Sequence, residues 1–254
     1  MKIFFIVVLV CLSAQLICPY PAIGEEIDYT PYGSLLKKYV FDGEIDYLNW
    51  QKNDFEVFEE YVKGLEGISL ANLGEDERKA FWLNAYNALT IYAVLKRMPD
   101  KSFLAKVFSV QMVPGFFDNI TYSVAGEDLT LNDIENQKLR EDFEDPRIHF
   151  AIVCASRSCP KIQNKVFTPK RLDKRLDAAA RIFLQDEYRN RLNKEKNTLY
   201  LSQIFDWFDG DFIKESGSVV DYVKQYLPKK DTRYISKNSI KVKHLFYNWI
   251  LNIK

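Results

Sequence analysis

The feature that most constrains the fold is a long helical pattern over residues 75–98. Acidic residues open the pattern, where they suit a helix N-terminus, and Pro99 ends it. Within it, residues 81–90 (FWLNAYNALT) place apolar side chains on nearly every side of the helix. A helix of this kind is buried, so the rest of the chain has to enclose it.

Two polar residues interrupt this apolar helix. Asn84 and Asn87 stand three positions apart and therefore share a helix face. Asparagine is a poor helix former, and a buried amide without a partner costs roughly 1–3 kcal/mol. Two interpretations stay open. The amides tie neighbouring loops together, or they orient a catalytic imidazole and donate hydrogen bonds to an oxyanion.

Nucleophiles and a possible base are crowded into residues 147–160 (RIHFAIVCASRSCP). One of the two histidines of the chain, His149, lies here together with Cys154 and Cys159. Residues 147–154 are short and rich in β-branched side chains, which predicts a strand. In an ideal strand, His149 and Cys154 would point to opposite faces, so a His–Cys pair requires a bend or a bulge.

Three interpretations of the cysteines stay open. A disulfide requires Cα atoms within about 7 Å, which a tight loop can supply. A nucleophilic thiolate, Cys154 or Cys159, requires a base, for which His149 is the candidate. A metal site would use His149, Cys154 and Cys159 as ligands. Their spacing lacks the pairs of ligands separated by two residues that are usual in such sites, and no fourth ligand is evident.

The helix expected over residues 132–140 carries two further candidates. Glu135 and Arg140 form a surface ion pair by default, which contributes little to stability. If Glu135 instead points to His149, it can set the tautomer of that ring. The second histidine, His244, alternates with apolar residues, as in a solvent-exposed strand.

The N-terminus predicts export. Residues 1–24 read as a signal peptide with a basic start at Lys2, an apolar run, and small residues before Glu25. Cleavage would remove two of the four cysteines and leave Cys154 and Cys159 in an oxidising compartment, periplasmic or extracellular. No later stretch is long and apolar enough to cross a bilayer.

Charge and composition bound the partners. The chain carries 35 basic and 35 acidic residues, which gives no reason to expect nucleic acid or an anionic membrane as a partner. Its apolar content of 47% is ample for a substantial core. We expect a small-molecule or peptide substrate, no cofactor and no metal.

The remaining patterns predict helices and strands without regular βαβ alternation. We expect an α+β fold, mostly helical, with a single domain around a small, largely antiparallel sheet, as cysteine peptidases have. An N-terminal helical segment over residues 25–74 would pack on a main domain over residues 75–254. Helices are expected at residues 28–40, 55–65, 102–108, 168–184 and 219–227, and strands at residues 45–48, 120–124, 128–131, 198–201 and 240–246.

At these residues the chain resembles the family catalogued as domain of unknown function 547. Four blocks carry the resemblance in family order: residues 81–90, residues 131–140 (LNDIENQKLR), residues 146–160 and the closing residues 247–252 (YNWILN). Asn136 and Asn248 depart from the family, which often has histidine and aspartate there. The resemblance marks Asn84, Tyr86, Asn87, Glu135, Arg140, His149, Cys154, Ser158, Cys159, Trp249 and Asn252.

The residues and the resemblance together suggest an exported thiol-dependent hydrolase or acyl transferase acting on an amide or ester. In this hypothesis Cys154 or Cys159 attacks, and His149 takes the proton. Asn84, Asn87 and Glu135 orient the site or stabilise charge, and Tyr86, Arg140, Ser158 and Trp249 bind the substrate. The alternatives are a non-catalytic cell-envelope binding module with a Cys154–Cys159 disulfide, and a metal or redox site.

Overall fold

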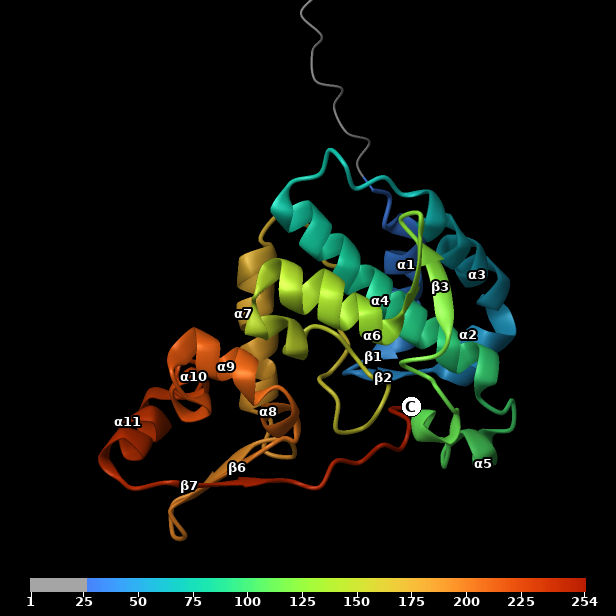
Figure 1. The fold of residues 1–254 in the computed structure, drawn as a ribbon. Coiled ribbons are helices and arrows are strands. Elements are labelled where there is room, and N and C mark those ends of the chain that lie inside the picture. Colours follow the sequence, from blue (N-terminus) through green and yellow to red (C-terminus); the bar gives the residue numbers. More distant parts are fainter. Residues whose placement is uncertain (1–26) are drawn as a thin grey trace, which may run out of the picture.

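The computed structural model describes residues 27–254 and has two hydrophobic cores side by side (Figure 1). The predicted signal peptide, residues 1–24, lies outside the described residues. Within residues 27–254, no helix combines the length and the apolar character that a membrane crossing needs. The predicted α+β class with mostly helical content is confirmed, and the strands form three small sheets.

The first core surrounds the long helix α4 (Glu75–Arg97). Nearly every side chain from Lys79 to Leu95 is buried, as the apolar pattern predicts. The Glu77 carboxylate accepts a hydrogen bond from the Gly74 N–H at 2.6 Å and so caps the helix start. The elements packed around α4 or attached to that layer are α1 (Thr30–Tyr39), β1 (Val40–Phe41), β2 (Glu44–Ile45), α2 (Tyr47–Asn53), α3 (Phe55–Gly64), η1 (Leu65–Gly67), α5 (Ser102–Ala105), η2 (Val110–Met112), β3 (Thr121–Val124), β4 (Glu127–Thr130), α6 (Leu131–Asp133) and η3 (Ile134–Glu141).

The second core lies in the C-terminal half and is rich in phenylalanine and tyrosine rings that pack on one another. Strand β6 is central in its sheet, antiparallel to β5 and parallel to β7. The elements of this half are η4 (Pro146–Phe150), α7 (Leu172–Leu184), β5 (Arg191–Asn193), β6 (Thr198–Leu201), α8 (Ile204–Trp207), α9 (Asp209–Ser216), α10 (Val219–Lys224), α11 (Lys229–Lys237) and β7 (Lys241–His244).

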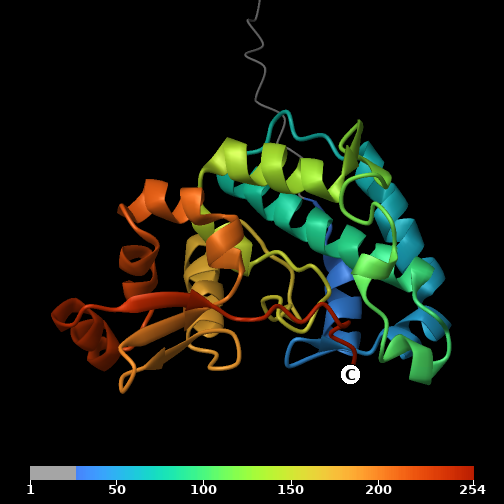
Figure 2. The same ribbon diagram turned by 60° about the horizontal axis from the view of Figure 1, so that its bottom comes forward.

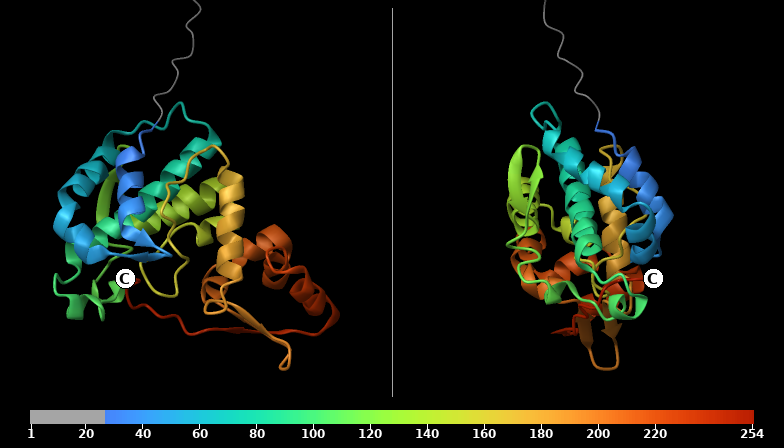
Figure 3. Two further views of the ribbon diagram at one scale, coloured as in Figure 1. Left: turned by 180° about the vertical axis from the view of Figure 1, so that it is seen from behind. Right: turned by 90° about the vertical axis from the view of Figure 1, so that its right-hand side faces the viewer.

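The last ten residues join the two halves. After β7 the chain runs back across the molecule to the β1–β2 hairpin, as Figures 2 and 3 show from three directions. On the way, the Leu251 N–H donates to the Phe108 carbonyl, and the Asn252 N–H donates to the Ala155 carbonyl. Ile253 then bridges to Ile45. We call residues 245–254 the closing segment.

The predicted strand over residues 147–154 is wrong. Asp145 accepts a hydrogen bond from the Arg147 N–H and Pro146 fixes the first turn, so the segment begins as the 3-10 helix η4. It continues as an irregular buried turn through Val153. The apolar run reflects burial between the two cores, and periodicity alone cannot separate such a run from a buried strand.

Three other boundaries differ from prediction. The helix expected from residue 132 begins earlier, at α6, because Thr130 and Asp133 form the capping box, and it continues as the π-helix η3. Helix α7 begins at Leu172 rather than at residue 168. Only Ile45 of the strand expected over residues 45–48 lies in a strand, since Asp46 caps helix α2.

Candidate functional site

The candidate site is a cavity of about 230 Å³ between the two cores. Cys154 and Trp249 pack against both cores and so mark their boundary. The walls are mostly apolar with a few polar groups, the usual composition of a small-molecule site. The residues that line the cavity are Tyr86, Phe117, Asn132, Glu135, His149, Ile152, Val153, Cys154, Cys159, Pro160, Ile204, Trp207, Phe208, Tyr247 and Trp249.

Asn87 fixes the loop that carries Cys154. Its side-chain N–H donates to the Ala151 carbonyl, and its side-chain oxygen accepts from the Val153 N–H, both at 2.9 Å. Asn84, one helical turn earlier, makes the same pair of bonds to the two main-chain groups of Phe167, both at 2.8 Å. Both asparagines therefore tie loops to α4, and neither lines the cavity.

The Cys154 sulfur is surrounded by hydrogen-bonding groups. It lies 3.1 Å from the Tyr247 hydroxyl and 3.2 Å from the Ser156 hydroxyl. Ala155 has a φ of 59°, in the left-handed region, and this turn brings Ser156 beside the sulfur. Such strained backbone at a residue other than glycine clusters at functional sites.

These contacts set the acidity of Cys154. Burial opposes ionisation of the thiol, but hydrogen bonds from Cys159, Ser156 and Tyr247 outweigh it and lower its pKa to about 7. Near neutral pH a large fraction of Cys154 is therefore thiolate, the form that acts as a nucleophile.

Cys159 has the opposite character. It is buried, and its sulfur accepts a hydrogen bond from the Cys154 N–H at 2.7 Å. Burial and the neighbouring Cys154 raise the pKa of the Cys159 thiol well above its usual value. Both cysteines are free thiols in the structure. The pair thus consists of one acidic and one weakly acidic thiol in a single loop.

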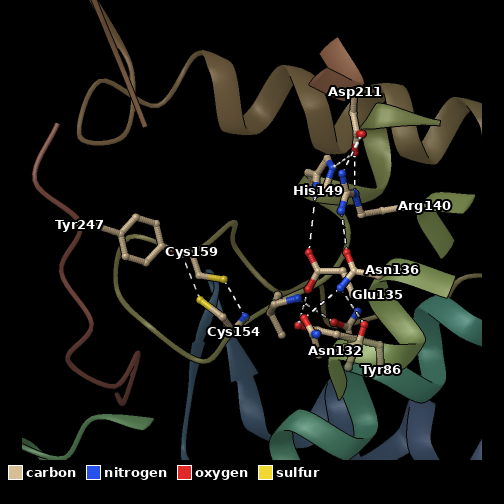
Figure 4. A network of polar contacts seen from close by, with 12 residues as sticks. Tyr86, Asn132, Glu135, Asn136, Arg140, His149, Cys154, Cys159, Asp211 and Tyr247 are labelled. Carbon is tan, nitrogen blue, oxygen red and sulfur yellow. Dashed lines mark hydrogen bonds and ion pairs between the residues drawn. The ribbon is translucent and has the colours of Figure 1, made fainter. Parts of the chain in front are cut away.

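His149 is held between two carboxylates rather than beside a cysteine (Figure 4). Its Nε2 lies 2.7 Å from an Asp211 oxygen, and its Nδ1 lies 3.8 Å from a Glu135 oxygen. The ring stacks on Phe208 with centroids 4.1 Å apart. Each ring nitrogen has a carboxylate as its nearest partner, so the predicted hydrogen-bonded Cys–His pair is not formed.

The protonation of this group follows from Asp211. Burial opposes its ionisation, but hydrogen bonds from His149 and Arg140 outweigh burial and keep the Asp211 pKa well below its usual range. An ionised carboxylate only accepts, so Nε2 of His149 carries a proton. Nδ1 is then the ring nitrogen that faces Glu135, at 3.8 Å.

Glu135 is the carboxylate inside the cavity. It sits on η3 and accepts a hydrogen bond from the Tyr86 hydroxyl at 3.0 Å. Burial raises its pKa, against the opposing effects of His149, Tyr86 and Arg140. Irregular π-helical turns are frequent at functional sites, and this one brings Glu135 toward the His149 loop. Of the two alternatives left open for Glu135, the structure has the one in which its carboxylate faces His149, 3.8 Å from Nδ1.

Arg140 supports the site from outside the cavity. Its Nε and Nη2 bind the two oxygens of Asp211 at 2.7 and 2.9 Å, a bidentate ion pair. Asn136 accepts from the Arg140 Nη1 and donates to Asn132, which lines the cavity. The default ion pair between Glu135 and Arg140 is replaced by this pair with Asp211.

The structure thus brings together six of the predicted site residues in one cavity and places the others around it. Tyr86, Glu135, His149, Cys154, Cys159 and Trp249 line the cavity. Ser158 accepts from the Asn248 N–H at 2.8 Å, and Asn252 bonds to Gly43 and Tyr47. His244 lies on β7, with its Nδ1 3.6 Å from Asp206, and does not line the cavity.

Sequence reasoning missed three residues that the geometry makes central. Asp211 holds His149, and no pattern in the sequence connects the two positions. Ser156 lies within the cysteine loop, where its proximity to Cys154 was visible but its turn geometry was not. Tyr247 opens the closing block of the family resemblance, and that was the available signal.

Metal ligation has no geometric support among residues 27–254. No group of three or more histidine, cysteine, aspartate and glutamate side chains there is arranged to hold a metal ion. His149, Cys154 and Cys159 share the cavity, but the His149 ring bonds to Asp211, the Cys154 sulfur to Tyr247, and the Cys159 sulfur to the Cys154 N–H.

Residues 70–184 match the family model described as Protein of unknown function, DUF547. The matched range includes α4, η3 and both cysteines, whereas Tyr247 and Trp249 follow its end. Comparisons with curated proteins and with solved structures found no match, so the expected likeness to cysteine peptidases stays a prediction. The chain is a DUF547 domain-containing protein, with the matched domain over residues 70–184.

Proposed function

We propose that this protein is a thiol-dependent hydrolase or acyl transferase that acts on an ester or amide, with Cys154 as the nucleophile. The observation that carries the proposal is the position of the Cys154 sulfur. It lies in the wall of a largely apolar cavity and is hydrogen-bonded by Tyr247 and Ser156, which together with Cys159 hold its pKa at about 7. Cys159 is unsuited to this role because its own pKa is raised and its sulfur is engaged by the Cys154 N–H.

Glu135 is the proposed acid and base. Its raised pKa suits a group that holds a proton in a buried cavity and gives it to a leaving group. His149 and Tyr86 position it, and Asp211 with Arg140 in turn fixes His149. The base role expected for His149 therefore passes to Glu135, and His149 becomes a positioning residue.

In the proposed reaction the Cys154 thiolate adds to the substrate carbonyl carbon, and a C–S bond forms. The bond to the leaving alcohol or amine breaks, and the leaving group takes the proton of Glu135. The Glu135 carboxylate then accepts a proton from water, or from an acceptor alcohol or amine, as that group attacks the thioester. The C–S bond breaks, the product leaves, and the thiolate is restored.

A panel of p-nitrophenyl esters and p-nitroanilides tests this proposal with the purified protein. We expect turnover that is lost in Cys154→Ser and retained in Cys159→Ser. Acid quenching during turnover should trap the acyl group on Cys154, which peptide mass spectrometry locates. Turnover that survives Cys154→Ser would refute the assignment of the nucleophile.

Thiol–disulfide exchange is the second candidate function. The two thiols have unequal acidity and lie within one loop, an arrangement that suits an attacking and a resolving cysteine. Here Cys154 would attack a substrate disulfide and form a mixed disulfide. Cys159 would then attack the Cys154 sulfur, which forms a Cys154–Cys159 disulfide and releases the substrate thiol. Cys159→Ser separates the two functions, because it leaves a hydrolase active but arrests exchange at a mixed disulfide on Cys154.

Export to the periplasm or the extracellular space is part of the proposal and rests on the signal-like sequence of residues 1–24. A fusion of these residues to a reporter enzyme that is active only after export tests it. Reporter activity that depends on the apolar run would support export, and a cytoplasmic fusion would refute it.

A further inference from the structure

A second hollow adjoins the cavity. It is an open groove of about 660 Å³ between residues 107–112 and the closing segment. Trp207, Tyr247 and Trp249 line both the groove and the cavity, so the two hollows adjoin at these three side chains. Tyr247 is common to the groove and to the surroundings of Cys154, because its hydroxyl is 3.1 Å from the sulfur.

The groove has an exposed apolar surface. Val107, Met112, Trp207 and Phe246 are exposed large apolar side chains, and Phe246 reaches 89% exposure. None of the described residues that line the groove carries a charge. An uncharged apolar patch of this kind, next to the cavity of the proposed nucleophile, indicates a site for an apolar ligand.

Several polar groups of the groove are engaged within the chain. Gln203 donates to the Leu245 carbonyl, and Asn248 accepts from the Ile250 N–H. The main-chain groups of residue 248 are bonded to Ser158, and the Ile250 carbonyl accepts from the Arg157 N–H. Within residues 27–254, no hydrogen bond engages the main-chain groups of Phe246, Tyr247 and Trp249, so an extended peptide is the competing occupant of the groove, whereas a hydrocarbon chain needs no polar partner.

We propose that the groove binds the aliphatic chain of the substrate, so that the substrate is an ester or amide of a medium- or long-chain fatty acid. The carbonyl carbon lies at Cys154, and the chain passes Tyr247 and Trp249 into the groove toward Met112 and Phe246. This inference rests on the proposed function and names the substrate class of the same site.

Alkylation of Cys154 tests the chain site without requiring turnover. The probes are iodoacetamide and its N-ethyl, N-hexyl and N-(trialanyl amide) derivatives, each assayed at pH 7 with peptide mass spectrometry to locate the adduct. Full burial of a methylene gives about a fourfold gain, and an open groove that covers half of the chain gives about twofold. The hexyl chain has about four more methylenes than the ethyl chain, so we expect N-hexyl iodoacetamide to react roughly fifteenfold faster than the N-ethyl probe.

Variants locate the effect. Phe246→Ser should lower the ratio of the hexyl to the ethyl rate about threefold, and Met112→Ser with Phe246→Ser should lower it further. Phe103→Ser is the matched control, because Phe103 is 78% exposed and does not line the groove. The ratio is taken within each variant, so a general change in thiol reactivity cancels.

The outcomes separate the two proposals. Slow reaction of Cys154 with plain iodoacetamide at pH 7 would overturn the nucleophile and the chain site that depends on it. Fast reaction with no gain from the hexyl chain would overturn the chain site alone. An equal gain from the trialanyl probe, or an equal loss in Phe103→Ser and Phe246→Ser, would overturn it too.

Discussion

Tyr247→Phe should raise the pKa of Cys154 by about one unit. The substitution keeps the buried ring and removes only the hydroxyl that lies 3.1 Å from the sulfur. A hydrogen bond to a charged group contributes about 1.5–3 kcal/mol, and one pKa unit corresponds to about 1.4 kcal/mol. The thiolate retains the donors of Ser156, so the smaller end of this range applies, and the pKa moves from about 7 to about 8.

The assay is the rate of Cys154 alkylation by iodoacetamide from pH 5 to pH 10. A thiolate of higher pKa is scarcer at low pH but more nucleophilic once formed. We therefore expect Tyr247→Phe to react about threefold more slowly than the wild type at pH 6 and about threefold faster at pH 10. The two profiles should cross between these values.

Tyr86→Phe is the matched control. It also removes a phenolic hydroxyl from the cavity wall, but this hydroxyl donates to Glu135 rather than to the cysteine. The midpoint of its alkylation profile should match that of the wild type. An unshifted midpoint in Tyr247→Phe, or equal shifts in the two variants, would refute the claim that the Tyr247 hydrogen bond sets the acidity of Cys154.

Three further predictions follow from the same contacts. Asn84→Ala and Asn87→Ala should each lower the free energy of unfolding, measured in urea, by about 2–4 kcal/mol, because each leaves two buried main-chain groups unpaired. Only Asn87→Ala should also slow the alkylation of Cys154. Equal slowing in both variants would contradict the assignment of Asn87 to the Cys154 loop. The Glu135 pKa is raised above 4.5, so the folded state binds the extra proton and the wild type loses stability as pH rises through the folded pKa. Glu135→Gln removes this loss, so the free energy of unfolding in urea should be higher for the variant than for the wild type at pH 8 and equal for the two proteins at pH 4. The Asp211 pKa is lowered below 3.8, so the ionised carboxylate stabilises the folded state above that pH, and this stabilisation is lost as pH falls through the folded pKa. Asp211→Asn should lower the free energy of unfolding by about 1.5–3 kcal/mol at pH 7. A difference between the variant and the wild type that does not shrink below pH 4 would show that the carboxylate charge is not its source.

The sequence predicted the elements with a strong local signal. The buried helix α4 and the β3–β4 hairpin follow from apolar periodicity, an acidic first turn and a turn at Gly126. Strand β7 was also predicted, although its parallel pairing with β6 was not. Short helices such as α8 and α9 carry too few turns for a periodic pattern, and their burial comes from the second core.

The segment over residues 147–154 failed for a different reason. Its β-branched residues satisfy a strand pattern, but the segment is buried from both sides and has no partner strand. The side chains named from it were nevertheless the right ones to place in the cavity, because residue type reports chemistry even where local geometry is wrong. Their roles changed with the geometry, since His149 turned toward carboxylates and not toward Cys154.

The acidity of Cys154 depends on contacts that no local pattern contains. Tyr247 is 93 residues from Cys154 in sequence, and it reaches the sulfur only because the closing segment returns across the molecule. The same segment bonds to the main chain of Ala155, Arg157 and Ser158, which holds the cysteine loop in its turn. The closing segment therefore supplies both the hydroxyl that stabilises the thiolate and the main-chain bonds that hold its loop, and both form when this segment joins the two cores. The low pKa of Cys154 thus depends on the complete fold, and its neighbours in sequence could identify it only as a candidate.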